Sequence, residues 1–308
     1  MKRCLFCYKE VSGDTDYHAA CSKKFFGTAE VPVLNLDEAL LETLAKQTVN
    51  KRIAITGVQP KLSVTLEKRE GHNRLTIVGL WGEYILKPQH KQYPQLPETE
   101  DLTMHLAALF KLPVCEHALI KASDGSKVYL AKRFDRKAGK KLHVEDFCQL
   151  AELLTENKYK SSYEKAGRIV MAYCRKGLDL LTYYELVLFS FLCGNNDMHL
   201  KNFSLLHTLN GAELSPAYDL LNVSLVNPAD KEEMALTLNG KKRKLRLPDF
   251  IKLAEGLGIN EKVYRHSFKR FAARNNEVEN VISRSFLTDE MKEKYGDIWR
   301  KRQCLFAQ

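Results

Sequence analysis

The 308-residue sequence lacks the glycine-rich fingerprints of the commonest nucleotide-binding folds. Neither G-x-G-x-x-G nor the Walker pattern G-x-x-x-x-G-K-[ST] occurs among its 16 glycines, so the sequence has no strong glycine-rich signature of a phosphate-binding loop. Long apolar runs are absent too. The strongest candidate, 178–193, is too short for a membrane span and carries Asp179 and Glu185. The first residues contain only a trivial apolar run, so we expect no signal peptide, no membrane contact and a cytoplasmic location.

Cysteine usage gives little sign of a disulfide framework. Five of the eight cysteines are scattered along the chain, as is typical of reduced, buried thiols. The composition, with 44% hydrophobic residues, supplies a full core for two lobes. The formal net charge of +10 favours acidic partners such as phosphates, nucleic acid or an acidic protein face. The one dense basic run, 241–244, is interpreted as a solvated loop.

The remaining three cysteines lie close together near the N-terminus. Cys4 and Cys7 form a Cys-x2-Cys pair, and His18 and Cys21 form a His-x2-Cys pair. Two short-spaced pairs of this kind are typical of a structural zinc site, which stabilises a segment too small to build its own core. The alternative is three reduced cysteines and a histidine that pack on a neighbouring domain.

The densest polar stretch lies at 194–204, between an apolar segment predicted as a buried helix and a short apolar strand. Asp197 is followed at the fifth position by Asn202, the spacing of the protein-kinase catalytic loop. A second carboxylate, Asp219, follows a predicted hairpin whose turn we place at Asn210-Gly211. Kinases bring in their second metal ligand from such a strand pair.

The first half of the chain contains further kinase-like features. A turn with Gly57 lies between β-type sequences, and a strand ends at Lys87, the position of a lysine that contacts nucleotide phosphates. A helix predicted from residue 98 to about 110 carries Glu100, which we expect to face Lys87. Another helix is predicted over 36–49.

The order of the predicted elements is strands, one helix, strands and then helices, which indicates an α+β fold with two segregated lobes, β-rich first and mostly helical second. Predicted domains are a Cys/His segment over 1–26, an N-terminal lobe over 27–136 and a helical C-terminal lobe over 137–308. Helices of the last domain are predicted at about 145–154, 160–175, 178–193, 247–257, 260–274, 276–285 and 287–302.

From about residue 27 onward the sequence resembles the HipA-like serine/threonine kinases of bacterial toxin–antitoxin systems, and its length resembles their compact HipT type. The resemblance depends on six segments in a fixed order: Thr56 to Leu62, Tyr84 to Pro88, Glu100 in its helix, Arg133 to Arg136, Gly194 to Phe203, and Pro216 to Asp219. It implies a two-lobed protein-kinase-like fold that uses ATP and Mg²⁺.

The resemblance also implies residue roles. Asp197 would be the catalytic base and His199 would organise its loop, while Asn202 and Asp219 would hold Mg²⁺. The nucleotide-binding residues would be Thr56, Gly57, Val58, Gln59 and Lys61 over the phosphates, Lys87 with its partner Glu100, Arg133 and Phe134 at the adenine, and Asp135 near the ribose.

Family members of the HipT type autophosphorylate two serines in the phosphate-covering loop, where this sequence has Ala54 and Thr56. Thr56 is therefore the expected autophosphorylation site. The implied substrate is an aminoacyl-tRNA synthetase, with tryptophanyl-tRNA synthetase as the first guess. The implied partners are a HipB-like DNA-binding antitoxin and a small HipS-like protein, so contact with DNA would be indirect. Alternatives are a catalytically inactive nucleotide-binding or nucleic-acid-binding module, and a small-molecule kinase.

Overall fold

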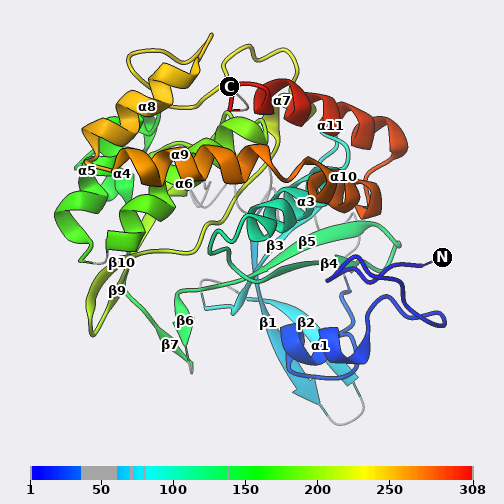
Figure 1. Ribbon diagram of the computed structural model, residues 1–308. Coiled ribbons are helices and arrows are strands. Elements are labelled where there is room, and N and C mark those ends of the chain that lie inside the picture. The colour runs from blue at the N-terminus through cyan, green and yellow to red at the C-terminus, as the bar shows by residue number, and fades with distance from the viewer. Residues whose placement is uncertain are drawn as a thin grey trace. The chain divides into compact units, whose positions relative to one another are not determined.

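The computed structural model describes residues 2–35, 61–69, 72–78, 81–137, 139–175 and 177–306, which form two compact units (Figure 1). The first unit comprises Met1–Asp101, Cys115–Arg133 and Arg284–Phe286. The second comprises Leu102–Val114, Phe134–Ser283 and Leu287–Gln308. The helix predicted over 36–49 lies outside the described residues. The domain boundaries placed at 26 and 136 stay a prediction.

The first unit is built on a five-stranded antiparallel sheet of order β2-β1-β3-β5-β4. Its strands are β1 (Leu62–Arg69), β2 (His72–Val78), β3 (Tyr84–Lys87), β4 (His117–Lys121) and β5 (Lys127–Lys132). Strand β3 is central, and its residues Tyr84, Leu86 and Lys87 are buried. Gly82 precedes β3 so closely against Val64 that a Cβ atom there would collide with the backbone.

Among the described residues of this unit, helix α1 and the first part of helix α3 accompany the sheet. Helix α1 (Ala19–Phe26) ends at Gly27, whose positive φ of 73° closes the helix in the left-handed conformation that glycine adopts readily. Helix α3 (Leu96–Leu109) has Glu98 in its first turn, where an acidic side chain favours the positive end of the helix dipole. The chain passes from the first unit to the second within α3, after Asp101.

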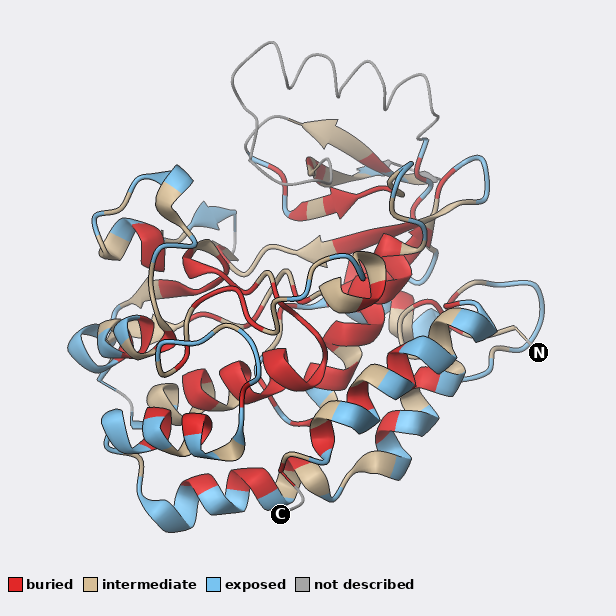
Figure 2. Cartoon of the chain, turned by 90° about the horizontal axis from the view of Figure 1, so that it is seen from above, coloured by how far each residue is buried: buried red, intermediate tan, exposed pale blue. Residues whose placement is uncertain are grey.

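The second unit is mostly helical. Its elements are β6 (Arg136–Lys137), β7 (Lys140–Lys141), β8 (Val144–Asp146), α4 (Phe147–Leu150), the 3-10 turn η1 (Thr155–Asn157), α5 (Tyr163–Tyr173), α6 (Gly177–Leu192), the 3-10 turn η2 (Leu200–Asn202), β9 (Ser204–Thr208), β10 (Gly211–Leu214), α7 (Val223–Val226), α8 (Leu247–Gly256), α9 (Glu261–Ala272), α10 (Asn275–Arg284) and α11 (Asp289–Gln303). Helix α6 is buried almost throughout its second half, Leu186–Leu192. Figure 2 shows the surrounding helices with buried residues on one face and exposed residues on the other, the pattern of amphipathic helices around a core.

Aromatic rings fill the core of the second unit. Phe110 stacks on Phe271 with ring centroids 4.6 Å apart and on Trp299 at 5.5 Å. Phe203 comes directly after the predicted catalytic loop. Its ring centroid lies 5.4 Å from that of Phe147 and 5.2 Å from that of Tyr183. Each such pair contributes about 0.5–1.5 kcal/mol beyond the area it buries. The loop therefore ends in a rigid part of the core.

Two local predictions were wrong. Residues 144–146 form strand β8, paired with β9, and only Phe147–Leu150 is helical, because Asp146 caps that helix by accepting a hydrogen bond from Gln149 N at 2.9 Å. The predicted β9–β10 hairpin is present, but Gly211 pairs with Thr208, so its turn is Leu209-Asn210, not Asn210-Gly211. The backbone of Gly211, the residue after this turn, has a positive φ of 109°.

Candidate active site

The loop 194–203 connects α6 to β9, and backbone hydrogen bonds join its first residues to α6 and α7. Asn195 N donates to Ser190 O in α6 at 2.8 Å, and Ser224 N donates to Gly194 O at 3.0 Å. Gly194 has φ 80°, and a Cβ atom at this position would collide with the buried side chain of Asn222. Only glycine meets both conditions without strain. The start of the loop is therefore fixed by local sequence.

Asp197 and Asn202, the pair singled out by spacing, lie together. Asn202 Nδ2 donates to the backbone oxygen of Asp197 at 3.0 Å, which leaves Oδ1 of Asn202 as the side-chain atom that can coordinate a cation. Asp197 N donates to Asn195 Oδ1 at 3.2 Å. The Asp197 carboxylate is thus presented on a loop whose backbone is held by two amide side chains.

Tyr159 is a member of this site that sequence reasoning missed. Its hydroxyl donates to Asp197 Oδ1 at 2.5 Å, and its ring packs in a T-shaped arrangement with that of His199, with ring centroids 4.9 Å apart. Burial raises the pKa of Tyr159 well above its usual range, and the hydrogen bond to Asp197 and the charges of Asp197 and Asp219 raise it further. The phenol therefore stays a donor. A tyrosine in a polar loop 38 residues upstream carries no motif that could have identified it.

His199 is buried and packed against Tyr159. Burial lowers the pKa of His199 below its usual value, and Lys158 lowers it further, against the opposing charges of Asp197 and Asp219. The imidazole is therefore neutral near pH 7. Its buried ring packs against Tyr159 without adding a charge to the loop.

Asp219 follows the β9–β10 hairpin. It lies close enough to Tyr159 and His199 for its charge to raise the pKa of both side chains. Its backbone has φ 59°, a left-handed conformation that is uncommon for residues other than glycine and often marks functional sites. The preceding Tyr218 is hydrogen-bonded to Ser204 at 2.6 Å and donates to Lys201 O at 2.9 Å. These bonds join the Asp219 segment to the end of the catalytic loop.

The structure thus brings Asp197, Asn202 and Asp219 into one region of the second unit. Two carboxylates and an amide oxygen are hard oxygen donors, the kind that Mg²⁺ prefers. The donor set therefore fits a magnesium ion held by Asn202 and Asp219.

In the first unit, Lys87 and Glu100 form a buried ion pair. Lys87 Nζ lies 2.5 Å from Glu100 Oε1, and the side chains are 5% and 3% exposed. Lys87 also lies 5.4 Å from the ring of Tyr129, its partner in the β3–β5 register. The expectation that Glu100 faces Lys87 agrees with this contact, while their roles toward a nucleotide stay a prediction.

The residues predicted to surround the adenine and ribose have the following contacts. Arg133 N donates to Glu83 O at 2.8 Å. The ring centroids of Phe134 and Tyr218 lie 5.5 Å apart. Asp135 is buried and pairs with Arg136 at 2.6 Å. Lys61 is half-buried just before β1. The predicted loop residues Thr56, Gly57, Val58 and Gln59, and also Ala54, lie outside the described residues.

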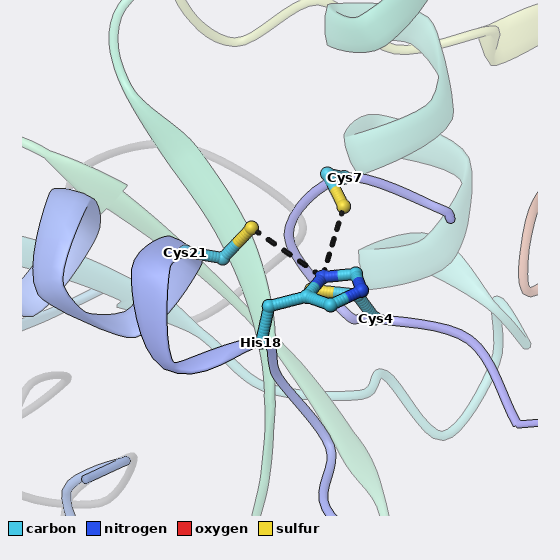
Figure 3. Close-up of side chains that lie close together, drawn as sticks. All are labelled: Cys4, Cys7, His18 and Cys21. Carbon is cyan, nitrogen blue, oxygen red and sulfur yellow. Dashed lines mark hydrogen bonds between the residues drawn. The ribbon is translucent and has the colours of Figure 1, made fainter. Parts of the chain in front are cut away.

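The four predicted zinc ligands also converge, in the first unit. One ligand atom from each of Cys4, Cys7, His18 and Cys21 lies within 4.8 Å of the others, and Figure 3 shows the side chains pointing toward one another.

Comparison with known proteins gives a consistent result. The family model described as "HipA-like C-terminal domain" matches residues 53–279. "Putative kinase Y4dM" of Sinorhizobium fredii is 30% identical over 72% of this chain and 59% of its own length. "Putative kinase" of Haemophilus influenzae is 25% identical over 82% of this chain and 81% of its own length. The serine/threonine-protein kinase toxin HipA of Shewanella oneidensis is 26% identical over 72% of this chain and 55% of its own length.

Solved structures show the same fold. HipA of Shewanella oneidensis, in a complex of HipA, HipB and operator DNA, superposes with a TM-score of 0.68 at 23% identity, over 82% of this chain and 63% of that one. The proinflammatory kinase CtkA of Helicobacter pylori gives 0.52 at 18% identity, over 72% of this chain and 86% of that one. The predicted α+β, kinase-like fold class is confirmed. In the described residues, no helix combines the length and the apolar character needed to cross a membrane.

Proposed function

Because the chain belongs to the HipA-like C-terminal domain family, we propose that it is an ATP- and Mg²⁺-dependent serine/threonine protein kinase and the toxin of a toxin–antitoxin system. The observation that carries this proposal is the grouping of Asp197, Asn202 and Asp219 on the loop after α6 and on the segment after β10. Phosphoryl transfer depends on positioning and charge neutralisation, and these side chains supply both.

In the proposed mechanism, Asp197 accepts the proton of a serine or threonine hydroxyl as its oxygen bonds to the γ-phosphorus and the bond to ADP breaks. Asn202 and Asp219 would hold Mg²⁺, which would supply neutralisation of the triphosphate charge. Lys87, oriented by Glu100 at 2.5 Å, contacts the phosphates. Tyr159 keeps the carboxylate of Asp197 oriented through its hydrogen bond.

For the substrate, we propose an aminoacyl-tRNA synthetase, tested first with tryptophanyl-tRNA synthetase, whose phosphorylation would arrest translation. For regulation, we propose a HipB-like antitoxin that binds DNA and a small HipS-like protein, as in the compact HipT type. A relative that is a kinase toxin, and a related fold solved with HipB and operator DNA, support this reading. The chain spans little more than half the length of that toxin.

The test is transfer of radioactive phosphate from ATP to purified synthetases. We expect Asp197→Asn to abolish transfer, whereas the matched control Asp297→Asn, an exposed residue of α11, keeps wild-type activity. Asp219→Asn should also lose Mg-dependent nucleotide affinity. Wild-type transfer by Asp197→Asn would refute the site assignment. Nucleotide binding without any transfer would favour an inactive binding module, and transfer only to small molecules would favour a small-molecule kinase.

Autophosphorylation is proposed at Thr56. After incubation with Mg-ATP, mass spectrometry should find phosphate in the peptide that contains residues 54–61, and Thr56→Ala should remove it. Equal labelling of that peptide in Thr56→Ala would end this part of the proposal without affecting the rest.

A further inference from the structure

The N-terminal Cys/His cluster lies in the first unit and has no part in the proposed phosphoryl transfer. We propose that Cys4, Cys7, His18 and Cys21 bind one structural zinc ion, which fixes residues 2–26 against strand β4 and the start of helix α3. This proposal does not depend on the proposed kinase activity. It concerns metal content and the stability of the first unit.

The distances between the ligand atoms agree with a tetrahedral zinc site. With Zn–S bonds of about 2.3 Å, Zn–N bonds of about 2.05 Å and tetrahedral angles, sulfur and nitrogen ligands lie roughly 3.6 Å apart. His18 Nδ1 lies 3.5 Å from Cys7 Sγ and 3.6 Å from Cys21 Sγ (Figure 3). A nitrogen lone pair accepts one good hydrogen bond, so two thiols at this distance are explained better by a shared cation.

The other ring nitrogen of His18 has the contact that a metal-bound histidine usually makes. Nε2 lies 2.8 Å from the backbone oxygen of Glu10. Donation to that carbonyl fixes the proton on Nε2 and leaves Nδ1 with its lone pair toward the sulfurs. His18 precedes α1 as its N-cap residue but makes no side-chain capping hydrogen bond, because its ring turns to the cysteines instead. The ring orientation therefore serves the cluster and not the helix.

The backbone around the first two cysteines is folded into a tight loop. Cys4 N donates to Lys9 O at 2.8 Å and Tyr8 N donates to Cys4 O at 3.0 Å, while Tyr8 has φ 62°. This loop brings Cys4 and Cys7 to one side, and the first turn of α1 supplies Cys21. All eight cysteines are free thiols, so no disulfide holds the arrangement. Four protein ligands close the coordination sphere, which is the mark of a structural site.

The segment that zinc would fix is hydrogen-bonded to strand β4 and to helix α3. Leu119 N in β4 donates to Leu5 O at 3.1 Å, and Tyr17 donates to Leu119 O. Tyr8 donates to Asp101 Oδ2 at 2.7 Å, and Asp101 follows directly after Glu100, the partner of Lys87. Zinc would therefore stabilise helix α3 indirectly, through the packing and hydrogen bonds of residues 2–26. Helix α3 carries Glu100, the partner of Lys87.

The experiment is metal analysis of the full chain purified without chelator from zinc-containing medium. We expect about one zinc ion per chain, and Co²⁺ exchanged into the site should give the absorption of tetrahedral thiolate-bound cobalt. Cys21→Ser should lose the metal, and His18→Cys should keep it, because a fourth thiolate replaces the imidazole. Cys304→Ser, at an exposed cysteine of the C-terminus, is the control and should keep it.

Removal of zinc from the wild type by a chelator should lower its midpoint of thermal unfolding and speed amide exchange at residues 96–101. The same treatment should leave Cys21→Ser unchanged. Zinc-free wild type together with no cobalt absorption would overturn the proposal, and so would zinc retention by Cys21→Ser. If Cys21→Ser does not fold, the metal content of His18→Cys and the cobalt spectrum of the wild type still test whether the four residues bind zinc. Phosphotransfer enters none of these measurements.

Discussion

Replacement of Glu100 by glutamine should destabilise the first unit strongly, because it removes the charge from a buried ion pair and little else. Glutamine keeps the shape of the side chain and an oxygen that can accept from Lys87. The lost attraction is large: two unit charges 2.5 Å apart interact by roughly 7 kcal/mol at an effective dielectric constant of about 20. Much of this is offset by the desolvation of both groups, and breaking a buried pair from one side typically costs about 3–5 kcal/mol.

Urea unfolding followed by circular dichroism is the assay. Glu100→Gln should lower the free energy of unfolding by about 3–5 kcal/mol, whereas Glu290→Gln, in the exposed pair with Lys294, should leave it nearly unchanged. A double variant, Lys87→Met with Glu100→Leu, should recover much of the loss, because neither charge of this pair then remains buried. The reasoning fails if Glu100→Gln is as stable as Glu290→Gln, or if the double variant is no more stable than the single one.

Three further results are expected in the second unit. Tyr159→Phe removes the hydrogen bond to Asp197, worth about 1.5 kcal/mol, so transfer should fall roughly tenfold with KM for ATP unchanged; an unaltered rate would mean that the contact does not orient the base. The lowered pKa of His199 means that the unfolded chain binds the proton more readily, so its contribution to stability should rise with pH and be lost as pH falls below about 6.5. Urea unfolding at pH 5 and 8 should give a smaller pH difference for His199→Gln than for the wild type. Gly194→Ala should cost about 2–4 kcal/mol, from left-handed strain plus the collision with Asn222. The control Gly240→Ala, with φ 75° and open space around it, should show the strain alone, about 1–2 kcal/mol.

Local spacing proved a good guide where the chemistry itself sets the spacing. The loop 194–203 holds Asp197 and Asn202 in one short segment, so their proximity could be predicted from a separation of five residues. Lys87 and Glu100 lie 13 residues apart, and their contact could be predicted only because the resemblance to kinases supplied the arrangement of strand and helix. The Cys/His pairs were found because metal ligands require short spacings.

Predictions failed where tertiary context decides between alternatives of similar local energy. The segment 145–154 has helical periodicity, yet pairing with β9 draws its first residues into a strand. At the hairpin, Thr208 Oγ1 accepts from Asn210 N and donates to Gly211 O, and these bonds favour a turn one residue earlier than Asn-Gly. Tyr159 could not be found from sequence, because its proximity to Asp197 depends on how the η1 region folds back on the catalytic loop.

The polar interior of the catalytic loop is itself an argument for function. Asn195, Asn196, His199 and Asn202 are all buried, although buried polar groups cost free energy unless they are fully hydrogen-bonded. Some of them are not: among the described residues, Nδ1 of His199 and Oδ1 of Asn196 have no hydrogen-bond partner. A loop selected only for stability would have apolar side chains at these positions, because the adjoining core of Phe203, Phe147 and Tyr183 could extend into them. The loop keeps its polar groups at that cost beside Asp197, where the proposed transfer of a proton and a phosphoryl group would need fixed dipoles.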